Sequence, residues 1–238
     1  MSRPAGMGTT MGGKGLFAAA AVVALALPVA AQAQEALGMD ALGQLESRYV
    51  QLNLGAGVGG ESKSRFNVPG VLSGRINTDL DVGPVVTGLA GLGYTSGFGF
   101  EVEGLYLQNK VDTEAADRAL NSPFDLKMKM TGGFANVKYE MVNPSPLFPY
   151  VAAGLGYGET QYRVFGDNGS SDGVLWQLKA GVAVPASDDV TVDLGYRFVR
   201  SPSYETTDRI MFQGQAYDAT FKAATQVHVL TAGVRWAF

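Results

Sequence analysis

The chain has 238 residues, of which 46% are hydrophobic and only 17% are charged, with 32 glycines and a formal net charge of −4. Soluble domains are usually about 25% charged and about 7% glycine, so this composition is unusual for a soluble protein, while the apolar content excludes a disordered chain. The absence of cysteine excludes disulfides and thiolate sites, the acidic balance argues against nucleic acid as a partner, and a single histidine excludes any mechanism that needs two.

The first 33 residues have the pattern of a secretory signal peptide. Arg3 and Lys14 precede an apolar stretch over residues 16–31, which ends beside small residues suited to cleavage. A helix that spans a membrane needs about 20 apolar residues, and this stretch is shorter. We therefore predict cleavage after Ala33 rather than a retained membrane anchor.

After this segment the apolar residues alternate with a period of two. In the last strand Leu230, Ala232 and Val234 share one face, whereas Thr231 and Arg235 share the other. Alternating segments of about ten residues are typical of strands that cross a membrane as a barrel. We predict eight strands, at about 48–58, 85–95, 97–109, 126–142, 148–162, 173–184, 189–200 and 225–238.

The strand predicted at 126–142 contains a change of phase. Met128 and Met130 share one face, whereas Ala135 and Val137 share the other. Because Gly132-Gly133 lies between the two patterns, we predict a β-bulge there, which would insert one residue into the alternation.

The predicted connections alternate between long and short. Short turns near Ser96 and at 143–147 and 185–188 are rich in residues that make tight turns. Long connections at one end and short turns at the other are typical of an outer-membrane barrel, with loops outside the cell and turns in the periplasm. An even number of strands puts both termini in the periplasm, so residues 34–47 become a short periplasmic segment before a barrel at 48–238. The long connections are at about 59–84, 110–125, 163–172 and 201–224.

Alternation alone does not decide which face of the barrel points outward. A soluble ligand-binding barrel of eight strands would place its apolar residues inside. Aromatic residues cluster beside the short turns, as in the girdle at a membrane interface, and favour the membrane barrel. We expect an all-β fold, an eight-stranded antiparallel up-and-down transmembrane β-barrel with short periplasmic turns and long extracellular loops. The clustered aromatic residues are Tyr94, Phe98, Phe100, Tyr139, Phe148, Tyr150, Trp236 and Phe238.

On this assignment the inner face collects four acidic and four basic residues. Eight strands enclose an interior that side chains fill, and charges there are costly unless they are paired. We predict a salt-bridge network that plugs the lumen, with an ion pathway through the same charges as the alternative. Its members are Glu101, Glu103, Lys138, Glu140, Lys179, Asp193, Arg197 and Arg235, with hydrogen-bonding groups from Gln51, Asn53, Asn136 and Gln177 and room left by Gly154, Gly156 and Gly181.

Three further features do not indicate a catalytic or cofactor site. Residues 55–60 match the dinucleotide-binding pattern G-x-G-x-x-G, but no helical pattern follows to face a pyrophosphate. The acidic turn at 166–173 lacks the carboxylate spacing of a calcium loop. His228 alternates with lipid-facing residues, so we expect it at the membrane interface. We predict no catalytic residue, no metal and no cofactor.

Three passages resemble the small outer-membrane barrel family of porin-like, opacity-type proteins, which is similar to the transmembrane domain of OmpA. Residues 149–159 read PYVAAGLGYGE, 180–198 read AGVAVPASDDVTVDLGYRF, and 228–238 read HVLTAGVRWAF. The resemblance implies an eight-stranded barrel in a Gram-negative outer membrane, with no catalytic residues to carry over. It also implies that Trp236 and Phe238 form the C-terminal signal read by the barrel-assembly machinery, although Trp236 stands where Tyr is common.

We expect a structural or surface-exposed outer-membrane protein that supports envelope integrity. The alternatives are a narrow channel for small solutes, an adhesin or surface antigen that acts through the loops, and last an enzyme that acts on lipid. The expected partners are outer-membrane lipid and lipopolysaccharide, the barrel-assembly machinery during biogenesis, and an unidentified ligand of the loops, but no nucleic acid.

Overall fold

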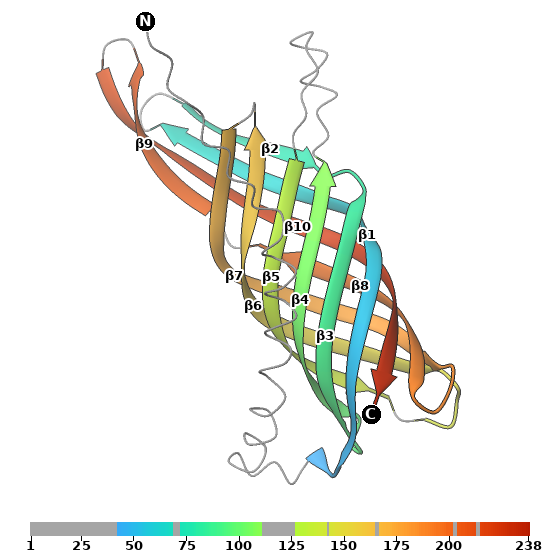
Figure 1. Ribbon diagram of the computed structural model, residues 1–238. Helices are drawn as coiled ribbons and strands as arrows, with labels where there is room; N and C mark the ends of the chain where they lie inside the picture. The colour runs from blue at the N-terminus through green and yellow to red at the C-terminus, as the bar shows by residue number, and fades with distance from the viewer. Residues whose placement is uncertain are drawn as a thin grey trace, which may run out of the picture.

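A computed structural model describes residues 42–68, 72–110, 127–141, 143–164, 167–201, 204–212 and 215–238. Ten strands form one antiparallel sheet, which the pairing of β1 with β10 closes into a barrel (Figure 1). Within these ranges no helix is long and apolar enough to cross a bilayer. The strands are β1 (Leu45–Val68), β2 (Leu72–Asp79), β3 (Gly83–Tyr94), β4 (Phe98–Lys110), β5 (Lys127–Glu140), β6 (Phe148–Val164), β7 (Asp167–Pro185), β8 (Val190–Arg200), β9 (Tyr204–Phe212) and β10 (Gln215–Ala237).

The barrel itself has eight strands, which confirms the predicted fold class. These strands are β1, β3 to β8 and β10, and each overlaps one of the eight predicted strands. The predicted signal peptide at 1–33 and the first part of the segment at 34–47 lie outside the described residues, while residues 45–47 already belong to β1. The backbone N–H of Phe238 donates to the carbonyl of Arg48, so both described ends of the chain lie at one end of the barrel. We call this the turn end and the opposite one the hairpin end.

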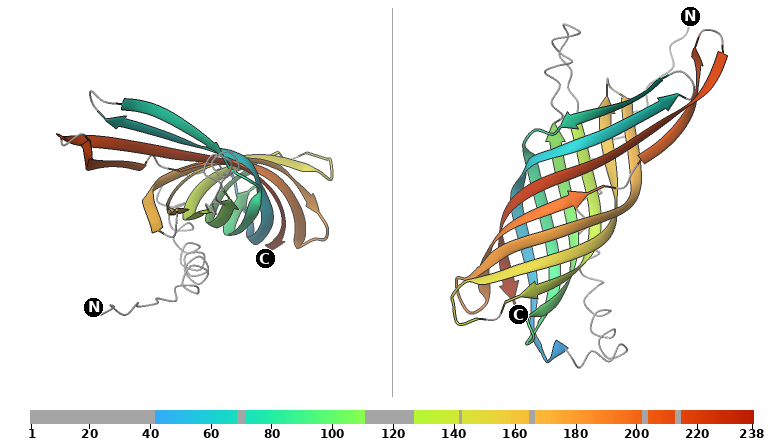
Figure 2. Two further views of the ribbon diagram at one scale, coloured as in Figure 1. Left: turned by 90° about the horizontal axis from the view of Figure 1, so that it is seen from above. Right: turned by 180° about the vertical axis from the view of Figure 1, so that it is seen from behind.

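At the hairpin end two of the predicted long connections are largely strand. β2 pairs with Glu61–Val68 of β1, and β9 pairs with Gln215–Ala223 of β10. Since β1 and β10 stay paired beyond the barrel, the order β2-β1-β10-β9 continues as a four-stranded sheet past the rim (Figure 2). Continued pairing satisfies the backbone N–H and C=O groups of these segments.

The other two predicted long connections differ from each other. The connection at 163–172 is almost wholly paired strand, because β6 and β7 remain in register up to Val164 and Asp167. The connection at 110–125 lies, beyond Lys110, outside the described residues.

The outer wall of the barrel is apolar. Leu54, Leu155 and Leu194 are 60%, 67% and 57% exposed, whereas the residues that alternate with them along each strand face the lumen. An exposed apolar surface of this kind is costly in water but suits a membrane, where a barrel presents its apolar set to lipid. The apolar face of the barrel therefore points outward, as in a membrane barrel, and not inward, as in a soluble ligand-binding barrel.

The predicted bulge at Gly132-Gly133 is wrong. The register of β5 with both β4 and β6 runs unbroken through these glycines, and Met128 and Met130 are fully buried on the same inner face as Phe134. The phase does not change: near the hairpin end the apolar residues Met128 and Met130 lie on the inner face, whereas toward the turn end Ala135 and Val137 lie on the outer face. A register shift lies instead in β1, between Gly57 and Gly59 opposite β10.

Aromatic side chains form two bands on the outer wall. Near the turn end the rings of Phe98 and Tyr139 lie 5.1 Å apart, and Trp236 is 44% exposed. Near the hairpin end the ring of Phe198 lies 5.3 Å from that of Trp176 and 5.3 Å from that of His228. Bands at both interfaces are typical of membrane barrels.

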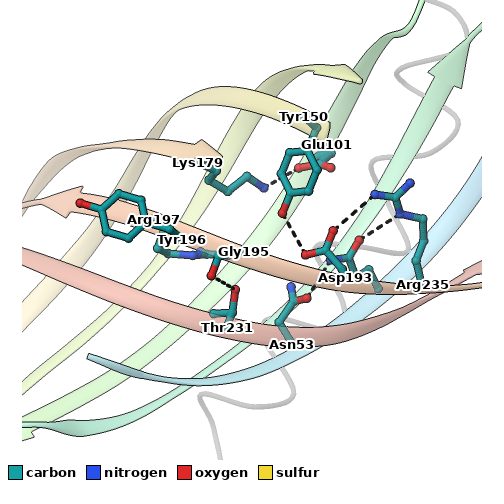
Figure 3. A pocket seen from close by; sticks show the side chains of 11 residues that line it. Asn53, Glu101, Tyr150, Lys179, Asp193, Gly195, Tyr196, Arg197, Thr231 and Arg235 are labelled. Atoms are coloured by element: carbon teal, nitrogen blue, oxygen red, sulfur yellow. Dashed lines mark hydrogen bonds and ion pairs between the residues drawn. The ribbon is translucent and has the colours of Figure 1, made fainter. Parts of the chain in front are cut away.

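Tyr150 does not belong to these bands, contrary to the prediction from its place beside a short turn. Its side chain is buried and points into the lumen (Figure 3).

Candidate functional site

The turn-end half of the lumen holds the eight charged residues singled out in the sequence. They project from β4, β5, β7, β8 and β10, and the alternation of each strand turns them inward. The structure brings all eight together in one continuous chain of ion pairs. In order, the chain runs Arg197, Glu103, Lys179, Glu101, Lys138, Glu140, Arg235 and Asp193.

The chain is tightest around Glu103, whose side chain is fully buried. Arg197 Nη2 lies 2.6 Å from Glu103 Oε1, and Lys179 Nζ lies 3.2 Å from Glu103 Oε2. Lys179 Nζ also lies 2.6 Å from Glu101 Oε2. The two contacts of Lys179 are charge-assisted hydrogen bonds, the stronger class of hydrogen bond in proteins, whereas the Arg197–Glu103 contact is an ion pair.

Toward the turn end the pairs loosen and become partly exposed. Lys138 Nζ lies 3.8 Å from Glu101 Oε1 and 3.0 Å from Glu140 Oε2. Arg235 contacts Glu140 at 2.9 Å and Asp193 at 3.6 Å. Acids and bases therefore alternate along the whole chain, so that no charge lies beside another of its own sign without a counter-ion.

Amide side chains satisfy further groups of the network. Asn136 Nδ2 and Gln177 Nε2 donate to Glu103 Oε2 at 3.0 and 2.9 Å. On the opposite wall Arg235 Nε donates to Gln51 Oε1 at 3.2 Å, and Gln51 in turn donates to Asn53 at 2.7 Å. Such bonds offset part of the cost of burying the charges, while Glu103 Oε1, Asp193 Oδ2 and Arg197 Nε make no hydrogen bond with the described residues.

Two tyrosines complete the network, and the sequence analysis missed both. The hydroxyl of Tyr49 donates to Glu101 Oε1 at 3.0 Å, and its ring lies 4.7 Å from Lys138 Nζ. The hydroxyl of Tyr150 donates to Asp193 Oδ1 at 2.9 Å (Figure 3). The signal was present in the alternation, because Tyr49 is in phase with Gln51 and Asn53.

The glycines of the inner face make room for particular side chains. A Cβ at Gly154 would lie 1.9 Å from Asn136 Oδ1, and one at Gly181 would lie 2.6 Å from the Tyr150 hydroxyl. A Cβ at Gly156 would lie 2.7 Å from the ring of Phe134. These positions therefore accommodate amide and aromatic groups rather than the long charged side chains that the sequence analysis expected there.

The hairpin-end half of the lumen is largely apolar, with Asn109, Thr160 and Thr225 as buried polar residues at the same level, and the sequence analysis did not predict this apolar cluster. Ten buried side chains from the strands around the lumen, together with Leu80 between β2 and β3, form one apolar cluster there. The lumen thus has two layers, charged toward the turn end and apolar toward the hairpin end. The apolar layer consists of Leu80, Val85, Leu105, Leu107, Met128, Met130, Phe134, Leu175, Val199, Val227 and Val229.

A small polar cavity remains within the charged layer. Glu101, Tyr150, Lys179, Asp193 and Arg235 are among its lining residues (Figure 3). Its side chains are engaged with one another, as the ion pairs and tyrosine hydrogen bonds above show. The arrangement holds charge in place rather than presenting a free nucleophile or base.

The remaining candidate residues lie away from this cavity. His228 is on the outer wall, where its Nδ1 lies 2.6 Å from the hydroxyl of Tyr196. The glycine-rich run at 55–60 lies inside β1. In the described ranges no three residues of the types His, Cys, Asp and Glu are grouped so that they could hold a metal ion. Trp236 and Phe238 are exposed at the turn end.

Comparison with known proteins gives the family. The chain matches the family model of the outer membrane protein beta-barrel domain over residues 17–238, whereas no curated protein matches it.

Three solved structures illustrate the likeness in fold. Neisserial surface protein A is 19% identical, with 80% of this chain and 97% of that chain covered and a TM-score of 0.43. OprG from Pseudomonas aeruginosa is 13% identical, with 83% and 98% covered and a TM-score of 0.50. Ail from Yersinia pestis, in complex with the heparin analogue sucrose octasulfate, is 14% identical, with 80% and 100% covered and a TM-score of 0.37. Of the three, OprG reaches a TM-score of 0.50, and at 13% identity its likeness concerns the fold alone. The chain belongs to the outer membrane protein beta-barrel domain family and is a protein of the outer membrane.

Proposed function

We propose that this protein is a closed structural barrel that supports the integrity of the outer membrane and holds two long hairpins at the cell surface. The observation that carries the proposal is the filled lumen, with a charged layer and an apolar layer in series. A solute that crossed the barrel would have to break both.

The energetic cost of opening differs between the layers. In the charged layer an opening would separate ion pairs such as Lys179–Glu101, which are buried and hydrogen-bonded. In the apolar layer an ion would lose its hydration without gaining a polar partner, which is costly in any apolar environment. The two layers together favour a barrel that contributes to the membrane as a sealed, rigid element.

The hairpins support the surface role. The sheet β2-β1-β10-β9 continues past the rim of the barrel, and β1 and β10 stay paired from the barrel wall into the hairpins, with one register shift between Gly57 and Gly59. A segment held in this way is presented in a fixed position relative to the membrane. The same feature supports an adhesin or surface-antigen role as a subordinate candidate, in which a ligand binds to the hairpins.

Deletion of the gene tests the proposed role. We expect the deletion strain to admit a hydrophobic dye and to become sensitive to detergent, and the full-length protein to restore the barrier. A variant with both hairpins shortened should also restore it, since the barrel is the sealing element. An unchanged barrier in the deletion strain would refute the structural role. If the shortened variant failed to restore the barrier, the hairpins rather than the barrel would be the part that supports it.

A narrow channel is the second candidate, and the polar cavity of Figure 3 favours it. A channel would need the apolar layer to part, so discrete conductance steps from the purified protein would support this candidate. We assign no catalytic residue, because the charged groups of the lumen are held in ion pairs and His228 contacts aromatic residues on the outer wall.

A further inference from the structure

The small polar cavity of the charged layer lies beside a glycine on the inner face of β8. Along this strand Asp193, Gly195 and Arg197 occupy successive inward positions, so that a residue without a side chain separates two charged ones. All three residues line the cavity (Figure 3). A Cβ at Gly195 would lie 2.9 Å from the Tyr150 hydroxyl and 3.1 Å from Thr231 Oγ1, so it would occupy part of this space. We call this space the Gly195 cavity.

The charged residues on either side of Gly195 are the two ends of the chain of ion pairs. The chain begins at Arg197, paired with Glu103, and ends at Asp193, paired with Arg235. Each end carries one buried atom that makes no hydrogen bond with the described residues, namely Arg197 Nε and Asp193 Oδ2. The 3.6 Å contact of Asp193 Oδ2 with Arg235 Nη2 is an ion pair but too long for a hydrogen bond. The cavity is therefore bordered by one residue with an unsatisfied donor and one with an unsatisfied acceptor.

Buried groups of this kind destabilise a folded protein unless something in the cavity pairs with them. The occupant must accept a hydrogen bond from Arg197 Nε and donate one to Asp193 Oδ2. An anion such as chloride has no proton to donate, and a metal cation has no lone pair with which to accept. A molecule that both donates and accepts satisfies both atoms.

The charges that line the cavity also favour a neutral occupant. A bound cation would lie among three positive groups, and a bound anion would lie beside two carboxylates, in a buried place where solvent screens little. The charged lining residues are Glu101, Lys179, Asp193, Arg197 and Arg235.

The size of the cavity limits this neutral molecule to water. The cavity volume is about 10 Å³, and one water molecule needs about 10–15 Å³ measured in the same way. A buried water typically makes about three hydrogen bonds. The hydroxyl groups of Tyr150 and Thr231, which border the space above Gly195, offer a further acceptor for it.

We propose that the Gly195 cavity is the binding site of one water molecule, which accepts a hydrogen bond from Arg197 Nε and donates one to Asp193 Oδ2. The water joins the first member of the chain of ion pairs to the last and closes the chain into a ring. Hydrogen bonds that form such a connected network strengthen one another. The site does not depend on whether the barrel supports the envelope, so the proposed function and this inference are tested separately.

The first test uses the full-length protein folded in micelles, with water itself as the probe. Magnetic relaxation dispersion of the water oxygen counts the internal water molecules that stay bound while the protein tumbles. Gly195→Ala fills the cavity with a methyl group. Gly88→Ala, whose Cβ would meet no atom within 4 Å, is the matched control. The heat-dependent shift on a gel shows that each variant is folded.

The second test needs no variant. Crystals of the wild-type protein are soaked in bromide or in rubidium, because anomalous scattering distinguishes either ion from water. A density map of the same crystals shows whether the space above Gly195 is occupied.

We expect Gly195→Ala to hold about one long-lived water fewer than wild type, and Gly88→Ala to hold the same number as wild type. The wild-type map should show one water within about 3.2 Å of both Asp193 Oδ2 and Arg197 Nε, without an anomalous signal. Equal water counts in wild type and a folded Gly195→Ala protein would overturn the proposal. A wild-type map without density above Gly195 would also overturn it, and bromide or rubidium bound there would show an ion site instead.

Discussion

Glu103→Ala removes the carboxylate on which the ion-pair network of the lumen depends most. Glu103 is fully buried and bonds to Arg197, Lys179, Gln177 and Asn136. After the substitution Lys179 keeps its contact with Glu101, whereas Arg197 keeps only its 3.1 Å hydrogen bond to Gln177 among the contacts described above. Removing one partner of a buried pair leaves an uncompensated charge and typically costs about 3–5 kcal/mol. We expect Glu103→Ala to lower the free energy of unfolding by that amount.

A charge-neutral double variant separates pairing from packing. Glu103→Leu combined with Arg197→Met replaces the pair by apolar side chains of similar length, and such replacements are often nearly neutral. The loss in free energy of unfolding for the double variant should therefore be about 1–3 kcal/mol smaller than the sum of the losses for the two single variants. Glu46→Ala, at an exposed position of β1, serves as the control and should change stability by less than about 0.5 kcal/mol.

The assay is equilibrium unfolding of the folded barrel in micelles. Tryptophan fluorescence follows the transition, because Trp236 is exposed on the outer wall and Trp176 belongs to the band at the other end. The shift in gel mobility between folded and boiled protein gives an independent measure. A Glu103→Ala protein as stable as wild type would refute the reasoning, since it would mean that water fills the lumen and screens the charges.

Three further predictions concern the lumen and assembly. Gly154→Ala should lower the free energy of unfolding by about 1–3 kcal/mol in the same assay, because its Cβ would lie 1.9 Å from Asn136 Oδ1. Gly88→Ala, whose Cβ would meet no atom within 4 Å, should change it by less than about 0.5 kcal/mol, and equal effects of the two would contradict the close packing. Leu107→Ala should cost about 2–5 kcal/mol because this side chain is fully buried in the apolar layer, and a negligible loss would indicate a wet lumen. Deletion of Phe238 should reduce the amount of folded barrel in the outer membrane but not refolding of the purified protein in micelles, and a defect in both would assign the residue to stability rather than to assembly.

The strands and the charged layer could be predicted from the sequence, because charged residues indicate the inner face of a membrane barrel. A charge in the wall of a membrane barrel is costly on the lipid side, so Lys179 and Arg197 indicate the inner face and fix the phase of their strands. Once the phase is known, alternation assigns every other position. The eight residues that the structure brings into one chain of ion pairs follow from this rule.

The apolar layer could not be predicted in the same way. Met128 and Met130 are apolar but face the lumen, whereas Lys129 between them lies on the outer wall, so the rule that apolar residues face lipid is reversed at this height of the barrel. The apparent change of phase at Gly132 arose from this. The cost of an apolar residue inside the barrel depends on its neighbours from other strands, which alternation along one strand does not describe.

The hairpins are a second feature that could not be predicted from the sequence. The segments at 59–84 and 201–224 contain many small and polar residues, and their composition suits a loop as well as an edge strand. The pairing of β1 with β10 continues beyond the barrel as far as Asn67 opposite Thr220, and the extended strands then pair with β2 and β9. This is a long-range effect, since β1 and β10 lie at opposite ends of the sequence.

A planar bilayer recording of the purified full-length protein tests most directly whether the lumen is closed. The two filled layers predict no discrete conductance steps for wild type, and none for Arg48→Gln, whose charge lies outside the lumen. Discrete, ion-selective steps in wild type that change when Glu103 is replaced would contradict a sealed barrel and would establish a channel through the charged layer.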